Sequence, residues 1–388
     1  APGVHLVLAP PKDLGTDTAR VAPGGAALTD AARVAPGGAA LTDTARVAPG
    51  SAALTDTARV APGGGAARPL AVKDVHPAGF DNSWVSDLNG RGEAIITATT
   101  VVVSEIQPPR AFVWRAGKVT ALRPPPGGIG ALARDINERG EVAGFCQSAA
   151  IDVRPCLWRQ GRPLALATID GRGQGIALAI NDRGAIVGDN QTLTGGTRAF
   201  LWRHGVVTDL GGARSATGLN ERTQVIGVHY TRGGRRGFVW DRGRLADLGT
   251  LGGTESVPAD ITEGGQIVGT STVAAGVSHA FLWQRGRLTD LGPGGAVGAD
   301  EHGQVVGWIT GGGWFTWRNG VRKEFAGTVS GITAPGRIAG ITQGRVFLRR
   351  DGRTVLGDPA AAVTAVNRRD QLAGWINVGS AQHAAVWN

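Results

Sequence analysis

The sequence lacks several common features, and each absence argues against a class of protein. Methionine does not occur at all, even at position 1, where the chain begins Ala1-Pro2-Gly3. We therefore expect that a signal peptide was removed before Ala1 and that the protein is secreted. An artificial start of the expressed sequence is the alternative. No run of eighteen apolar residues occurs, so no membrane span is predicted.

Sequence signatures of several enzyme classes are also missing. The seven histidines are never three or four residues apart, which excludes zincin-type spacing. The two cysteines have no second Cys or His pair to complete a zinc site. A nucleophile elbow is absent, and residues 171–175 lack the Lys-Ser/Thr of a phosphate-binding loop. No metal or cofactor is predicted. An enzyme is not excluded, because residues from distant repeats can meet in space.

What the sequence does contain is a repeat, whose clearest copy reads Ser-His-Ala-Phe-Leu-Trp at residues 278–283. Aromatic residues make up 5% of the chain, and Trp outnumbers Tyr eleven to one, as expected if Trp occupies a repeat position. The seventh copy has Arg349 where Trp is expected. Eight copies align, with central residues at 112–114, 156–158, 200–202, 238–240, 281–283, 315–317, 346–348 and 385–387.

A second element precedes each copy and is clearest at residues 135–144, Asp-Ile-Asn-Glu-Arg-Gly-Glu-Val-Ala-Gly. Asn and Gly favour a tight turn because both tolerate left-handed backbone geometry. The Val- and Ile-rich runs beside it favour strands. One unit therefore contains four short strands in about forty residues, which is typical of a propeller blade. Trp and Phe side chains are expected to fill the space between neighbouring blades.

We predict an all-β fold, a β-propeller of eight four-stranded blades over residues 70–388, with seven blades as the alternative. The eighth unit reaches Asn388 without a fourth strand, and residues 70–75, Leu-Ala-Val-Lys-Asp-Val, match that missing strand. Since a closed ring must pair its last edge strand, we expect residues 70–75 to complete the last blade. Val72 would then lie near Val386.

The chain resembles the bacterial extracellular HAF-repeat proteins. The His-Ala-Phe that names this family stands at residues 279–281, and its companion Asp-Leu-Gly-Thr-Leu-Gly-Gly at residues 247–253. The resemblance covers roughly residues 70–388 and is most specific in the third to fifth units. It implies a secreted bacterial propeller and implies no activity.

Two segments precede the predicted propeller. Residues 1–17 form an N-terminal segment, and residues 18–69 contain four copies of a 13-residue repeat rich in Ala, Gly, Pro and Thr. This composition buries too little apolar surface to offset the entropy of ordering, which favours a flexible spacer. The alternative is four small hairpins that dock on the propeller or on a partner.

Cys146 and Cys156 fall at the end of strand 2 and in strand 3 of one predicted blade. A disulfide between them is expected, in keeping with an oxidising compartment. Two buried thiols are the alternative.

The connections between strands divide over two faces of the predicted ring. Connections 2–3 and 4–1 vary in length, as binding loops on rigid scaffolds do. We predict ligand binding on this variable-loop face, by Trp308, Trp314, Trp375, His229 and His383. An exposed Trp ring matches the flat face of a pyranose, and additional packing is the alternative for each Trp.

The opposite, short-turn face carries connections 1–2 and 3–4 and a series of basic residues. They form either a basic rim or simply solvated turns, and they are Arg115, Arg159, Arg203, Arg242, Arg285, Arg318 and Arg349. The net charge is +9, and 36 of the 40 basic residues are Arg. A high-GC genome produces this bias by itself. The functional alternative is an acidic polymer as partner. Nucleic acid is not expected, because no aromatic–basic interleaving marks a base-stacking surface.

The sequence therefore favours a secreted, non-catalytic binding module that recognises a glycan or protein through the variable-loop face. One alternative is a scaffold or assembly component of a secreted complex. The other is a polysaccharide lyase or hydrolase with its site at the channel mouth, using His229 or His383.

Overall fold

The computed structural model describes residues 69–102, 105–149, 152–171, 174–192, 196–333, 336–350 and 352–388. The predictions for residues 1–17 and for the repeats of residues 18–69 lie outside the described residues, apart from Pro69. Within the described ranges all regular structure is β-strand, arranged in eight four-stranded antiparallel sheets and one two-stranded hairpin. The hairpin consists of β4 (Val101–Val102) and β5 (Glu105–Ile106).

Each of the first four sheets is an up-and-down meander, and in blade 1 the β4–β5 hairpin is inserted between the second and third strands. Blade 1 contains β2 (Asn82–Leu88), β3 (Ala94–Thr99), β6 (Arg110–Arg115) and β7 (Lys118–Leu122). Blade 2 contains β8 (Gly128–Ile136), β9 (Val142–Ser148), β10 (Val153–Arg159) and β11 (Arg162–Ala165). Blade 3 contains β12 (Gly175–Ile180), β13 (Ile186–Gln191), β14 (Thr197–Arg203) and β15 (Val206–Asp209). Blade 4 contains β16 (Ser215–Leu219), β17 (Val225–Thr231), β18 (Gly234–Asp241) and β19 (Arg244–Asp247).

The other four sheets repeat this plan. Blade 5 contains β20 (Gly252–Ile261), β21 (Ile267–Val273), β22 (Ser278–Gln284) and β23 (Arg287–Pro293). Blade 6 contains β24 (Gly295–Ala299), β25 (Val305–Trp308), β26 (Trp314–Arg318) and β27 (Val321–Phe325). Blade 7 contains β28 (Thr328–Thr333), β29 (Arg337–Thr342), β30 (Arg345–Arg350) and β31 (Arg353–Pro359). Blade 8 contains β32 (Ala362–Val366), β33 (Leu372–Val378), β34 (Ala381–Trp387) and β1 (Val72–Asp74).

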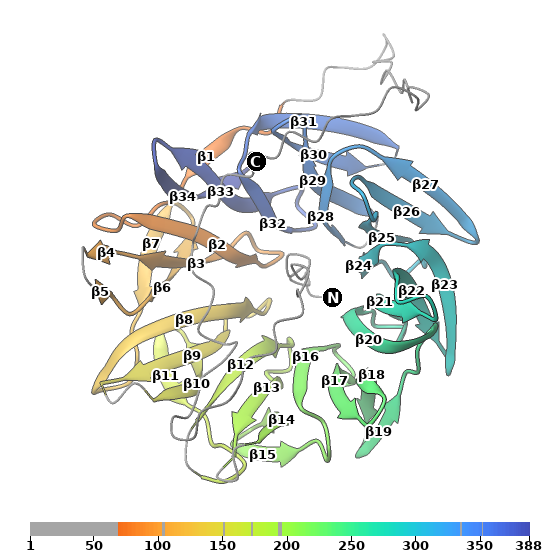
Figure 1. Ribbon diagram of the computed structural model, residues 1–388. Helices are drawn as coiled ribbons and strands as arrows, with labels where there is room; N and C mark the ends of the chain where they lie inside the picture. Colours follow the sequence, from red (N-terminus) through yellow and green to blue (C-terminus); the bar gives the residue numbers. More distant parts are fainter. Residues whose placement is uncertain are drawn as a thin grey trace. The chain divides into compact units, whose positions relative to one another are not determined.

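The blades of residues 69–388 surround a central axis, and the first strand of each is innermost (Figure 1). The ring closes through β1, which pairs antiparallel with β34 and matches Val72 with Trp387 and Lys73 with Val386. Backbone bonds of 3.1 Å in both directions between Ala71 and Asn388 extend the pairing. The predictions of eight blades, rather than seven, and of closure by residues 70–75 are both confirmed.

Two kinds of turn make the short-turn face regular. The hairpins between third and fourth strands have two-residue turns, such as Ala116-Gly117, with positive φ angles of 48° and 88°. Such type I′ turns match the twist of the paired strands. The turns between first and second strands are held by their Asn. The Oδ1 of Asn137, for example, accepts bonds from the N–H groups of Arg139 (3.0 Å) and Glu141 (2.9 Å).

The repeated Phe, Gly and Trp positions form the packing between blades. Gly269 lies beside the ring of Phe281, and a Cβ on this Gly would come within 2.1 Å of the Val257 carbonyl oxygen. The corresponding Phe rings are at most 2% exposed, and they are Phe200, Phe238, Phe281, Phe315 and Phe347. Trp202 is buried among Leu157 and other apolar residues of blade 2. The expected core role of the repeat Trp is therefore confirmed for this residue.

A series of side-chain bonds, the Asn ladder, connects the turns of successive first strands. The Nδ2 of Asn137 donates to the Asn181 carbonyl oxygen at 3.0 Å. Equivalent bonds join Asn89 to Asn137, Asn181 to Asn220, Asn220 to Thr262 and, across the closure, Asn367 to Asn89. At the same position, blades 5, 6 and 7 have Thr262, Asp300 and Thr333, which carry no amide donor. The seams from blade 5 to blade 8 therefore lack this bond.

Candidate functional site

Trp314 does not present a free face to a ligand. Its side chain is part of the core, with the residue 3% exposed. The ring stacks on Phe325 and Phe347 at centroid distances of 4.4 Å and 5.4 Å. Its Nε1 donates to the Ala326 carbonyl oxygen at 3.1 Å. The packing alternative for Trp314 is therefore correct, because the neighbouring blade covers the indole.

The other two predicted Trp residues are half-buried and lie in separate blades. Trp308 ends β25 in blade 6, where it packs against the cluster that contains Trp314. Trp375 lies in β33 of blade 8, opposite Ala384 of β34. The structure does not bring these two residues into one site.

The predicted histidines each lie beside an aspartate of the fourth strand of their own blade, and His383 forms a hydrogen bond to it. The Nδ1 of His383 lies 2.8 Å from Oδ2 of Asp74 in β1. The Nε2 of His229 lies 3.3 Å from Oδ2 of Asp247. The same arrangement joins His279, the His of the His-Ala-Phe motif, to Asp290 at 2.9 Å. These contacts give the histidines a role in joining outer strands, and they place His229 and His383 in different blades.

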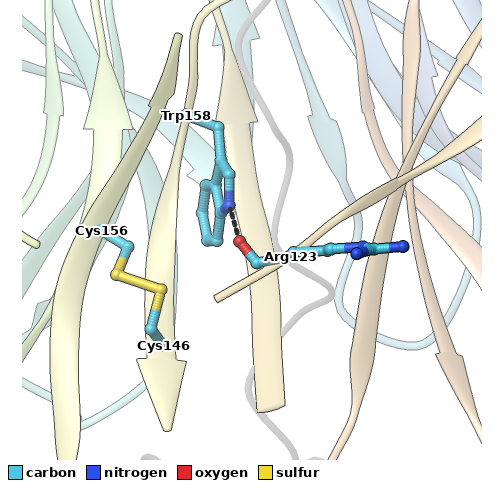
Figure 2. The surroundings of a disulfide bond; sticks show 4 residues. All are labelled: Arg123, Cys146, Cys156 and Trp158. Carbon is cyan, nitrogen blue, oxygen red and sulfur yellow. Dashed lines mark hydrogen bonds between the residues drawn. A yellow bond between two sulfur atoms is a disulfide. The ribbon is translucent and has the colours of Figure 1, made fainter. Parts of the chain in front are cut away.

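The disulfide between Cys146 and Cys156 forms as predicted. It links β9 to β10 in blade 2 (Figure 2). Both residues belong to an apolar cluster that continues into blade 1 through Ala111 and Leu122. The disulfide therefore supports the boundary between the first two blades.

A groove lies at this boundary, where β6 begins and β7 ends, on the variable-loop face. We call it the blade-1 groove, and its volume is about 530 Å³. That volume is within the range of small-molecule sites. Its lining is Phe80, Arg110, Ala111, Phe112, Ala121, Leu122, Arg123, Pro124, Pro125, Pro126, Gly127 and Gly128.

The aromatic wall of the blade-1 groove consists of Phe80 and Phe112. Their rings meet edge to face, with centroids 5.3 Å apart and an interplanar angle of 78°. Phe112 occupies the repeat position whose other Phe rings are fully buried, yet it is partly exposed. An aromatic surface is therefore open to solvent here.

Two arginines provide the charge of the groove. Arg110 begins β6, and Arg123 follows β7; both are exposed. Among the described residues neither takes part in an ion pair. Each guanidinium therefore offers its donors to an external anion.

Hydrogen bonds fix the backbone of residues 123–128, which form another wall of the blade-1 groove. The Nε1 of buried Trp158 donates to the Arg123 carbonyl oxygen at 2.8 Å, beside the disulfide (Figure 2). The Gly128 N–H donates to the Pro125 carbonyl oxygen at 2.9 Å, which closes the turn. Three consecutive prolines restrict the backbone further. The groove is thus pre-formed, with its floor on the cluster that contains the disulfide.

Sequence reasoning did not identify the groove residues. Phe80 precedes the first repeat unit, and Pro124 to Pro126 lie in a connection of no fixed length. The available signal was the run of three prolines directly after Arg123, with Arg110 farther back in the sequence.

A second polar feature lies between blades 3 and 4. Burial raises the pKa of Asp189 to about 7, although bonds from Ser215 and Ala216 and the charge of Arg214 lower it. The Ser215 Oγ–H and the Ala216 N–H donate to this carboxyl at 3.1 Å and 3.2 Å. These bonds link two blades. Across the described ranges, no group of three or more His, Cys, Asp or Glu could hold a metal ion.

Comparisons with known proteins concern the fold. No family model matches the sequence, and no curated protein matches it. The β-propeller domain of the Trilobed protease from Pyrococcus furiosus is similar at 8% identity and a TM-score of 0.43, over 83% of this chain and 96% of that one. YCF48 bound to D1 peptide is similar at 10% identity and a TM-score of 0.40, over 83% of this chain and 97% of that one.

The gluconolactonase XC5397 from Xanthomonas campestris is similar at 16% identity and a TM-score of 0.32, over 53% of this chain and 82% of that one. The fold is that of a propeller module, a class that includes binding proteins and enzymes. In the part of the chain that the structure describes, no helix is both long and apolar enough to cross a membrane.

Proposed function

We propose that the blade-1 groove binds an anionic glycan and that the protein is a non-catalytic recognition module. The observation that carries this proposal is the partly exposed Phe80–Phe112 pair beside Arg110 and Arg123, which form no ion pair with the described residues. Aromatic faces pack well against the apolar faces of sugar rings, in the way argued for Trp in the sequence. The aromatic wall therefore favours a carbohydrate.

The two arginines favour an acidic carbohydrate over a neutral one. A guanidinium binds a carboxylate through two parallel hydrogen bonds, which adds both strength and orientation. A uronic acid carries such a carboxylate on its pyranose ring. The groove therefore fits a short stretch of a uronic-acid polymer, with rings against Phe80 and Phe112 and carboxylates at Arg110 and Arg123.

The lining also supports a binding role without catalysis. It consists of Phe, Arg, Ala, Leu, Pro and Gly side chains. None of these side chains is a nucleophile or exchanges a proton near neutral pH. A lyase or hydrolase would need such a group beside the sugar.

We place this module outside the cell and within the HAF-repeat family. The disulfide supports an oxidising compartment. His279 of the His-Ala-Phe motif contacts Asp290, which begins another Asp-Leu-Gly at residues 290–292, and this pairing of the two kinds of motif supports the family proposal. Detection of the protein in culture medium, with its disulfide formed, is the corresponding measurement.

The test is calorimetric titration with oligogalacturonate and with a neutral galactan of the same length. We expect saturable binding of the uronate alone. Phe80→Ala and the pair Arg110→Gln/Arg123→Gln should each weaken it about tenfold or more, since a hydrogen bond to a charged group contributes about 1.5–3 kcal/mol. Arg154→Gln is the matched control, because Arg154 stands at the position of Arg110 in blade 2, outside the groove lining.

Three results would overturn the proposal. The first is equal binding of the neutral and the acidic oligosaccharide. The second is binding that survives the Arg110→Gln/Arg123→Gln change. The third is hydrolysis or cleavage of the uronate during the titration, which would assign the groove to an enzyme.

A further inference from the structure

The short-turn face carries a set of exposed arginines that lack counter-ions. They stand at the hairpins between third and fourth strands in blades 3 to 6. We call them the Arg arc, and they are Arg203, Arg244, Arg285, Arg287 and Arg318. Among the described residues, none of them takes part in an ion pair.

The position of Arg203 and Arg318, the last residue of the third strand, is neutralised in blades 1 and 2. Arg115 lies 2.6 Å from Glu93, and Arg159 lies 2.8 Å from Glu141. These two carboxylates also bind Arg91 and Arg139 of their own turns. In blades 3 to 6 the position of the Glu is taken by uncharged residues, Ala185, Gln224, Gln266 and Gln304. The hairpin arginines of blades 3 to 6 therefore lack the carboxylate that neutralises Arg115 and Arg159.

The acidic residues in the turns between first and second strands of blades 3 to 6 are held closer to the axis, whereas Asp241 lies at the outer hairpin of blade 4, 3.9 Å from Arg242. They follow the Asn position in the turns of the innermost strands, which surround the centre of the ring (Figure 1). Their carboxylates accept backbone N–H groups of the preceding blade; Asp182 accepts from Glu138 at 2.7 Å, and Glu301 from Glu263 at 2.8 Å. They are thus directed into inter-blade contacts, while the Arg arc lies at the outer hairpins.

The hairpins of the Arg arc also carry exposed apolar side chains. Its residues lie at three positions of one type I′ hairpin that recurs around the axis. Arg203 and Arg318 end third strands, Arg285 is the first turn residue, and Arg244 and Arg287 begin fourth strands. Val206 and Val321 begin the fourth strands at two of these hairpins and are 66% and 59% exposed. They lie in blades 3 and 6, at the two ends of the arc.

We infer that the Arg arc is a docking surface for an anionic lipid bilayer. A flat anionic surface can contact all the hairpins at once, and the contributions of basic residues near such a surface add. The exposed valines favour a bilayer over a soluble polyanion, because an apolar side chain gains from the headgroup boundary and not from a hydrated polymer. Docking through this face leaves the blade-1 groove on the side away from the membrane.

The test is co-sedimentation of the full chain with phosphatidylcholine vesicles that contain or lack phosphatidylglycerol. We expect binding to the anionic vesicles alone, falling with added salt. The variant Arg203→Gln/Arg285→Gln/Arg287→Gln/Arg318→Gln should lower partitioning about tenfold or more. The matched control removes the same charge from the variable-loop face outside the blade-1 groove, as Arg154→Gln/Arg214→Gln/Arg232→Gln/Arg345→Gln, and should bind vesicles as the unmodified chain does.

A second variant changes a single residue and retains every arginine. Ala185→Glu places a carboxylate where Glu141 stands in blade 2, so it should pair with Arg183 and Arg203 and weaken vesicle binding without unfolding the ring. Equal loss in both quadruple variants would overturn the inference, since net charge alone would then explain the binding. Heparin binding that depends on the arc, without vesicle binding, would also overturn it and assign the arc to a soluble polyanion.

Discussion

The environment of Asp189, between blades 3 and 4, makes the stability of the protein depend on pH. Its carboxyl is enclosed between β13 and β16, and burial raises its pKa from the ordinary 3.8 to about 7. The folded protein therefore binds a proton that the unfolded chain has released between these two values. Stability supplied by this group is fully present below about pH 4 and is lost as the pH rises through about 7.

We expect Asp189→Asn to remove this loss. Between about pH 5 and pH 8, the free energy of unfolding should decline less in the variant than in the unmodified protein, by on the order of 2 kcal/mol. Ser215→Ala should have the opposite effect, because it removes a bond that stabilises the charged carboxylate. Urea denaturation at several pH values measures both slopes. Parallel slopes in all three proteins would contradict the assignment.

The bonding partners of the histidines could not be predicted from the sequence. The repeat indicated that His279 and His383 share a position, but their acceptors lie on the fourth strand. For His383 that acceptor is Asp74, which precedes it by 309 residues. The contact exists because the ring closes there. Without the closure, an isolated His at the start of a strand is equally consistent with a ligand-binding role.

The hairpin of β9 and β10 connects stability to the proposed site. Its disulfide joins residues 10 positions apart, and its apolar cluster forms the floor of the blade-1 groove. Trp158 on β10 also fixes the Arg123 carbonyl oxygen. A loosened hairpin should therefore disturb the groove before it disturbs the opposite face.

We expect Cys146→Ser/Cys156→Ser to lower the free energy of unfolding by about 3 kcal/mol, the value for a short loop. Affinity for oligogalacturonate should fall several-fold, while partitioning onto anionic vesicles stays unchanged, because the Arg arc lies in blades 3 to 6. Thermal unfolding and the two binding assays test this. Unchanged oligogalacturonate affinity would show that the disulfide does not support the structure of the blade-1 groove.

The strands were predictable from the sequence because repetition reveals them. Residues 70–75 matched the fourth strand of other units, and β1 proved to be that strand. The groove was not predictable in the same way. Phe80 and Pro124 belong to connections that occur once, and periodic patterns contain no information about them. Phe112 was expected in the core with its counterparts, but it lies next to Phe80 at the rim of blade 1.

Over the whole ring, polar contacts between blades are unevenly distributed. The Asn ladder joins blade 8 to blade 1 and continues through blades 2, 3 and 4 to blade 5. It is absent between blades 5 and 6, between blades 6 and 7, and between blades 7 and 8. Thr333, at the ladder position of blade 7, has a buried hydroxyl without a hydrogen-bond partner in the described structure. Regions with fewer such bonds open more readily. Blade 7 should therefore be the first to lose protection.

We expect backbone amides of β28 to β30 to exchange with solvent faster than those of β8 to β10. Thr333→Asn supplies the missing amide donor and should stabilise the ring by about 1 kcal/mol, the typical net contribution of a hydrogen bond. Asn181→Thr is the reverse change and should destabilise it comparably. Hydrogen-exchange mass spectrometry and denaturant unfolding provide the measurements. Uniform protection around the ring would contradict this reasoning.

The three-residue strand β1 gives the ring a mechanical property. Ala71 and Asn388 are paired, so the chain enters and leaves the propeller at the same point. Tension applied between a tether on the N-terminal side and one on the C-terminal side would pull the β1–β34 bonds apart one after another, beginning at Ala71 and Asn388. Antiparallel strands loaded in this way yield at lower force than strands loaded along their length. Tethered from both sides, the propeller would give way first at its closure, where β1 pairs with β34 of blade 8 and Leu70 accepts a bond from Asp358 of blade 7.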